Sequence, residues 1–164
     1  MRVNILAIMI VTAIVIAAGC RNDVVSDERT AEQYVEKQGY AIITRDDKVK
    51  KYVLDGSKLY GSEDSVLYQQ TWGVQKEEPD SYIGKEIAVY GFTVRNHPLE
   101  AIYQRETHIA VMMCEGKVIG GTSFPVQQGA LLMGWPYSLD GKTLEEVTGL
   151  TYQEWSDRWE KKYG

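Results

Sequence analysis

The sequence is poor in the residues that build metal sites and disulfide scaffolds. It has two cysteines and two histidines among 164 residues, and no Cys-x-x-Cys occurs. A structural zinc site usually needs about four Cys, His or carboxylate ligands, with some of them close in sequence. Two cysteines also make no disulfide framework. We therefore expect no metal, no cofactor and no fold that depends on disulfides.

Local motifs for nucleophilic catalysis are missing as well. There is no G-x-S-x-G and no phosphate-binding glycine loop. Cys114 and His108 do not form a local pair, because a strand of that length would hold them about 20 Å apart. His97 would reach Cys114 only through the tertiary fold. A small apolar cysteine near a turn is the favoured interpretation of Cys114.

Carboxylates are plentiful but stand in turn-like segments, where solvated charge is their ordinary state. The residues concerned are Asp46, Asp47, Glu77, Glu78 and Asp80. A glycosidase-type pair is defined by its spacing in three dimensions, so the sequence leaves acid–base hydrolysis open.

Clusters of positive charge are absent too. The net charge is −5, and the lysines are scattered rather than gathered in a block. Affinity for nucleic acid depends on Lys and Arg that neutralise phosphates, so we expect no nucleic-acid partner. A charged fraction of 25% and an apolar fraction of 44% are typical of a folded chain, and the length fits one domain.

The one long apolar run lies at the N-terminus. Residues 3–18, VNILAIMIVTAIVIAA, carry no charge, follow Arg2, and lead through Ala17, Ala18 and Gly19 to Cys20. This run is shorter than the ~20 residues that a membrane-spanning helix requires. The segment resembles a bacterial lipoprotein signal peptide, with Ala17 to Cys20 matching the lipobox.

This resemblance implies how the protein is processed and where in the cell it is located. A signal peptidase would cut between Gly19 and Cys20, and Cys20 would carry the diacylglyceryl and acyl (palmitate) chains. The protein would then be anchored by lipid in the bacterial cell membrane and face outside the cytoplasm. Residues 1–19 would be the signal peptide, 20–30 the lipidated N-terminus and tether, and 31–164 a single domain. An uncleaved N-terminal anchor is the alternative.

The sequence of the domain predicts short helices and strands. Thr30 with Gln33 suggests a capping box that opens a helix over 30–39, and a second helix is expected to begin near Ser62. Strands are expected over 40–45, 49–54 and 86–96, the last apolar on both faces and therefore central. Residues 108–125 predict a hairpin that turns at Glu115-Gly116, and Gly120-Gly121 suggests a weakened strand or the close approach of another group.

Two capping boxes predict short helices near the C-terminus. They are formed by Thr143 with Glu146 and by Thr151 with Glu154, and the first helix would end at Gly149. Because strands do not alternate regularly with long helices, we expect an α+β fold: an antiparallel sheet of about four to five strands with helices on one face.

The last predicted helix carries an aromatic stripe of Tyr152, Trp155, Trp159 and Tyr163 on one face. This spacing favours docking of the face onto the sheet, and the alternative is a partly exposed surface for a partner or for lipid headgroups. Three further aromatic residues in loop-like contexts either line a recognition groove or fill the edge of the core; they are Trp72, Trp135 and Tyr137.

The domain also resembles, in general style, the small α+β domains of unknown function on many bacterial lipoproteins. We expect a lipid-anchored, extracytoplasmic binding or protein-interaction module of the cell envelope, without catalytic activity. The alternatives are an envelope hydrolase that uses dispersed carboxylates or Cys114, and a structural accessory subunit of an envelope complex.

Overall fold

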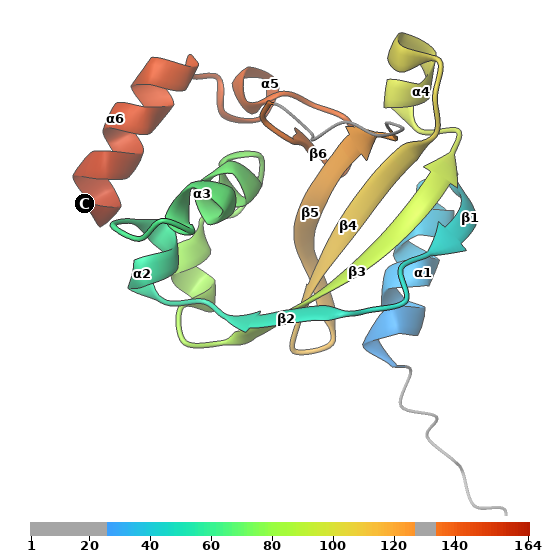
Figure 1. The fold of residues 1–164 in the computed structure, drawn as a ribbon, viewed down its shortest axis with the longest axis horizontal. Coiled ribbons are helices and arrows are strands. Elements are labelled where there is room, and N and C mark those ends of the chain that lie inside the picture. The colour runs from blue at the N-terminus through green and yellow to red at the C-terminus, as the bar shows by residue number, and fades with distance from the viewer. Residues whose placement is uncertain (1–25, 127–133) are drawn as a thin grey trace, which may run out of the picture.

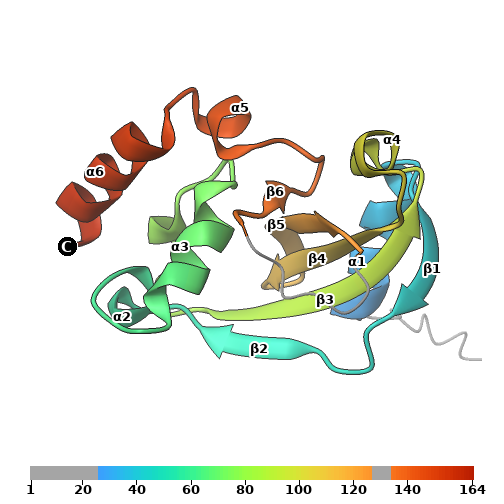
Figure 2. The same ribbon diagram turned by 45° about the horizontal axis from the view of Figure 1, so that its top comes forward.

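The computed structural model describes residues 26–126 and 134–164, and it folds them into an antiparallel sheet with surrounding helices (Figures 1 and 2). The strands are β1 Ala41–Arg45, β2 Lys50–Val53, β3 Glu86–Arg95, β4 Thr107–Cys114, β5 Lys117–Pro125 and β6 Tyr137–Ser138. The helices are α1 Asp27–Lys37, α2 Gly56–Leu59, α3 Ser65–Gly73, η1 Pro79–Tyr82, α4 Pro98–Tyr103, α5 Leu144–Thr148 and α6 Tyr152–Tyr163. The expected α+β class is confirmed.

The sheet has six strands in the order β1-β3-β4-β5-β6, and β2 also pairs with β3. β1 and β2 lie along the same side of β3, where β1 pairs with residues 92–95 and β2 with residues 86–89. β4 pairs along the other side. The strand predicted over 86–96 is therefore central, and the short β6 adds a strand beyond the expected number.

The predicted hairpin forms between β4 and β5. Cys114 faces Lys117 and Met113 faces Val118. The turn residues Glu115 and Gly116 have positive φ angles of 51° and 76°. Two central residues with positive φ match the twist of paired strands, which accounts for a two-residue turn at this site.

Helices contact both faces of the sheet rather than one. Phe92 and Val94 of β3 pack in one apolar cluster with Val35 of α1. Ile87 of β3 belongs to a second cluster, with Trp72 of α3. Successive side chains of a strand point to opposite faces, so the two clusters lie on opposite sides of the sheet. Figure 1 accordingly shows α1 on one side and α2, α3 and α6 gathered on the other.

Two helices begin elsewhere than the sequence predicts. α1 starts at Asp27, and Ser26 caps it by accepting a hydrogen bond from the Arg29 amide. Thr30 lies inside this helix, so the predicted cap is wrong, and residues 27–30 belong to the domain rather than to a tether. α3 starts at Ser65 rather than near Ser62. Ser62 does not cap this helix; its backbone carbonyl accepts a hydrogen bond from the Ser65 amide.

The two C-terminal capping boxes are confirmed. Thr143 and Glu146 exchange side-chain and backbone hydrogen bonds at the start of α5, as do Thr151 and Glu154 at the start of α6. α5 ends at Gly149 with φ 71°. Beyond these caps, Trp155 and Trp159 of α6 pack in one apolar cluster with Trp72 of α3.

Candidate functional site

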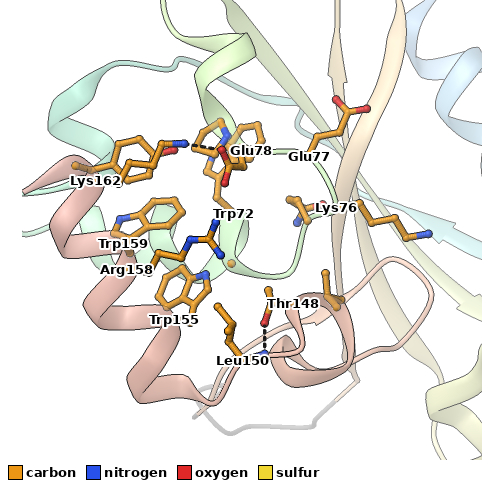
Figure 3. A pocket seen from close by; sticks show the side chains of 15 residues that line it. Trp72, Lys76, Glu77, Glu78, Thr148, Leu150, Trp155, Arg158, Trp159 and Lys162 are labelled. Carbon is orange, nitrogen blue, oxygen red and sulfur yellow. Dashed lines mark hydrogen bonds and ion pairs between the residues drawn. The ribbon is translucent and has the colours of Figure 1, made fainter.

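A hollow of about 200 Å³ opens beside α6, and Figure 3 shows its lining. It lies between α6, the connection from α5 to α6, and the segment that joins α3 to η1. Its aromatic residues are Trp72, Trp155, Trp159 and Tyr163. Its charged residues are Lys76, Glu77, Glu78, Arg158 and Lys162. We refer to this space as the hollow.

The aromatic stripe of α6 forms one wall of the hollow. Trp155 and Trp159 are buried, at 7% and 8% exposure, whereas Tyr152 is 55% exposed. The Trp159 indole Nε1 donates a hydrogen bond of 2.8 Å to the Leu59 carbonyl at the end of α2. The stripe is thus docked, as its spacing favoured, but it docks onto α2 and α3. The stripe as a whole is therefore not an exposed partner surface.

The rings of the stripe form a continuous chain of contacts. The ring centroids of Trp155 and Trp159 are 4.9 Å apart, and those of Trp159 and Tyr163 are 4.5 Å apart. Trp135 meets Trp155 edge to face at 4.9 Å. Edge and tilted contacts of this kind are the favoured arrangements of aromatic pairs. Trp135 therefore fills the edge of this cluster, as the sequence favoured.

Gly73 makes this aromatic packing possible. A Cβ atom at this position would lie 2.6 Å from Cζ3 of Trp135 and 3.0 Å from Cζ2 of Trp155. The end of α3 therefore has room for both indoles only because residue 73 has no side chain.

Gln75 fixes the opposite wall of the hollow to the sheet. Its Nε2 donates a 2.9 Å hydrogen bond to the Gly121 carbonyl, and its Oε1 accepts a 2.8 Å bond from the Gly121 amide. A Cβ at Gly120 would lie 2.2 Å from that Oε1. The close approach expected at Gly120-Gly121 is thus made by a side chain, which leaves the following residues 76–78 to line the hollow.

Ion pairs hold the far end of α6 against η1. Lys162 Nζ lies 2.5 Å from Glu78 Oε2 and 2.7 Å from Asp80 Oδ2, and the Tyr163 hydroxyl donates to Asp80 at 2.6 Å. Lys162 and Tyr163, both bound to the Asp80 carboxylate, lower the pKa of Asp80. Burial and the bond to Asp80 raise the pKa of Tyr163 to about 12. These bonds join α6 to the start of η1 beside the hollow.

Arg158 differs from the other charged residues of the hollow. It is exposed, and its guanidinium points toward the middle of the hollow, between Trp72 and Leu150 (Figure 3). Within residues 26–126 and 134–164 it forms neither an ion pair within 4.0 Å nor a hydrogen bond, whereas Lys162 is bound to two carboxylates. Its five N–H donors are directed at open space.

His97 has a structural role, and Cys114 is buried. His97 caps α4, because its Nδ1 accepts a 3.1 Å hydrogen bond from the Leu99 amide. The proton of the neutral ring is therefore on Nε2, which donates a 3.0 Å hydrogen bond to the Leu139 carbonyl. Burial lowers the pKa of His97. Cys114 is 4% exposed, and burial raises its pKa, which disfavours the thiolate that a nucleophile needs. The weighed pairing of Cys114 with His97 is therefore not assembled.

Most of the carboxylates considered as acid–base catalysts are bound to other side chains. Asp46 lies over Gly91 and pairs with His108 Nε2 at 3.2 Å. Glu77 accepts a hydrogen bond from the Tyr82 hydroxyl. Glu78 and Asp80 are bound by Lys162. In the part of the chain that the structure describes, no group of three or more His, Cys, Asp or Glu residues is placed to hold a metal ion.

Two features relevant to membrane attachment stand apart from the hollow. The predicted cleavage and lipidation residues, Gly19 and Cys20, lie outside the described residues. Over residues 26–126 and 134–164, the helices are too short or too polar to cross a bilayer.

No protein-family model, no curated protein and no solved structure matches this chain.

The hollow could be found only in part from the sequence. The stripe was visible as helical spacing, and Trp72 was singled out as a groove candidate. Gln75 and Lys162 were missed because their partners lie far away in sequence; Gln75 and Gly121, for example, are 46 residues apart. Arg158 was missed because the segments that surround it meet only in the fold.

Proposed function

We propose that this protein is a lipid-anchored, extracytoplasmic binding module of the bacterial cell envelope that acts without catalysis, and that the hollow is its binding site. In this proposal Cys20 carries the lipid and residues 1–19 are removed. The domain from Ser26 onward presents the hollow to a partner or ligand.

The single observation that carries the binding role is the arrangement of Arg158 in the hollow. A largely apolar, aromatic pocket with a few directed polar groups is the usual form of a ligand site. The hollow combines aromatic and charged lining residues, and Arg158, which has no ion pair among the described residues, is directed into it. The residues weighed as nucleophiles are buried or serve as helix caps, which favours binding over covalent chemistry.

In this proposal the lipid on Cys20 would determine the location. One acyl chain gives only reversible membrane binding, whereas two or more chains anchor a protein durably. A short polar segment between Cys20 and α1 would keep the domain close to the membrane surface.

Replacing Cys20 tests the anchor. We expect Cys20→Ala to leave an uncleaved precursor without lipid, and Cys114→Ala to be processed and lipidated like the wild type. Intact mass spectrometry of the membrane fraction reads out both. A wild-type protein cut at another bond, with an unmodified Cys20, would overturn the lipid anchor.

Site-specific cross-linking in cells tests the binding site. A photoreactive residue at Lys76, whose side chain leaves the hollow at its rim and would lie beside the part of a bound partner that projects from it, is compared with one at Lys48, which is exposed in the turn between β1 and β2. We expect a discrete adduct from position 76 and none of the same mass from position 48. Identical adduct patterns from both positions would indicate random collision and would contradict the hollow as the site.

A further inference from the structure

We propose that the hollow binds a ligand with one carboxylate next to a ring-sized apolar group, and that Arg158 receives the carboxylate. This inference rests on the proposed function, because it names the chemistry of the ligand that the hollow would hold.

The size of the hollow sets the size of the bound group. Its volume is about 200 Å³. An apolar cavity of about 150 Å³ accommodates benzene, whereas sites for drug-sized ligands span roughly 300–1,000 Å³. The hollow therefore fits a single ring-sized group, such as one aromatic amino-acid side chain.

The walls of the hollow set the apolar character of that group. Trp155, Trp159 and Leu150 line it, and the two tryptophans, which are 7% and 8% exposed, present the small uncovered part of their surface to it. Aromatic rings pack well in edge-to-face and offset contacts, so a flat apolar group is the best match.

The charges around the hollow select an anion. Glu78 is neutralised by Lys162, and Glu77 is bound by Tyr82. Lys76 extends away from the middle of the hollow, so Arg158 is the cation directed inward (Figure 3). A cationic ligand would meet this guanidinium and be repelled, although the chain as a whole has a net charge of −5.

Charge, rather than the geometry of Arg158, favours a carboxylate over a phosphate. A guanidinium binds either anion through two parallel N–H···O bonds. A phosphate monoester would bring about two negative charges beside Glu77, whose bond to the neutral Tyr82 hydroxyl leaves its charge in place, and Arg158 is the cation directed inward to offset them. A monoanion is the better match.

Calorimetric titration of the full chain in nonionic detergent tests the proposal. The probes are N-acetyl-L-phenylalanine and N-acetyl-L-phenylalaninamide, which share the ring and differ in the carboxylate. Because charge-assisted hydrogen bonds to a guanidinium are strong, we expect the amide to bind at least about 10-fold more weakly. Equal affinity of the two probes, or no binding of the acid at millimolar concentration, would overturn the proposal.

Two matched variants assign the carboxylate to its receptor. We expect Arg158→Gln to weaken binding of the acid to the level of the amide. Arg105→Gln should leave binding unchanged, since Arg105 is exposed and lies outside the hollow. An equal loss in both variants would show a general charge effect and would reject Arg158 as the receptor.

Peptides distinguish the two sources of such a ligand. A short peptide that ends in phenylalanine is compared with the same peptide amidated at its C-terminus. Binding of the free-acid peptide would identify the C-terminal residue of a polypeptide as the ligand. Binding of the amino-acid derivative alone would identify a free small carboxylic acid. If no carboxylate binds but position 76 still yields its discrete adduct, the ligand class fails and the proposed function stands.

Discussion

At the scale of single residues, the walls of the hollow depend on two positions. One has no side chain and so leaves space for two indoles, and the other has a buried side-chain amide that bonds to the sheet. Gly73 lets two indoles approach the end of α3, and Gln75 joins the next segment to β5. Both residues act through shape and hydrogen bonds rather than through contact with a ligand, so their replacement should change stability first.

Gly73→Ala should destabilise the protein. The new methyl group would meet the Trp135 and Trp155 rings, and overpacking of this kind costs about 1–3 kcal/mol. Urea unfolding followed by tryptophan fluorescence measures the loss. Gly56→Ala is the matched control, because nothing lies within 4 Å of its added Cβ, and its effect should stay within about 0.5 kcal/mol.

Gln75→Ala should cost about 1–3 kcal/mol of unfolding free energy, since it leaves the buried Gly121 amide and carbonyl without partners. The Gly121 amide should also exchange with solvent faster. Gln153→Ala provides the comparison, because among the described residues the Gln153 side chain bonds only to the exposed Asp157. If both variants unfold at the same urea concentration, the buried bonds of Gln75 do not form in solution.

At the scale of elements, local signals predicted most of the fold. The hairpin turn and both C-terminal capping boxes were predicted correctly, because each depends on residues only a few positions apart. The start of α1 was predicted wrongly, although Asp27 and Glu28 stand in its first turn, where acidic residues favour the positive end of the helix dipole. The side on which helices pack was missed, even though the central strand was recognised as apolar on both faces.

Docking of α6 depends partly on charge, so it should respond to acid. Lys162 and Tyr163 lower the pKa of Asp80, so its folded-state value lies below the ordinary ~3.9 of the unfolded chain. This contribution to stability is complete above the unfolded pKa and is lost as pH falls through the folded one. The stability advantage of wild type over Asp80→Asn should therefore shrink below about pH 4.

Urea unfolding of both proteins from neutral to acidic pH measures this difference, and the remaining carboxylates cancel because both proteins share them. An advantage that stays constant across the acidic range would mean that the Lys162–Asp80 pair does not hold α6 in solution.

At the scale of the whole molecule, the sheet brings together segments that the sequence keeps apart. Residues 72–79 and 147–163 are separated in the sequence by β3, β4 and β5. These three strands pair in the sheet, and the two segments that flank them in the chain then meet at the hollow. Long-range placement of this kind leaves no local pattern. The sequence therefore pointed to an aromatic surplus, and the hollow with Arg158 at its centre became visible only in three dimensions.

The central claim is that the hollow is the binding site, and the yield of the position-76 adduct in cells tests it most directly. Charge reversal by Arg158→Glu is compared with Arg105→Glu, which changes the net charge equally outside the hollow. We predict that the adduct disappears in the Arg158 variant and persists in the Arg105 variant, with equal amounts of folded protein. An adduct of undiminished yield in Arg158→Glu would contradict the account.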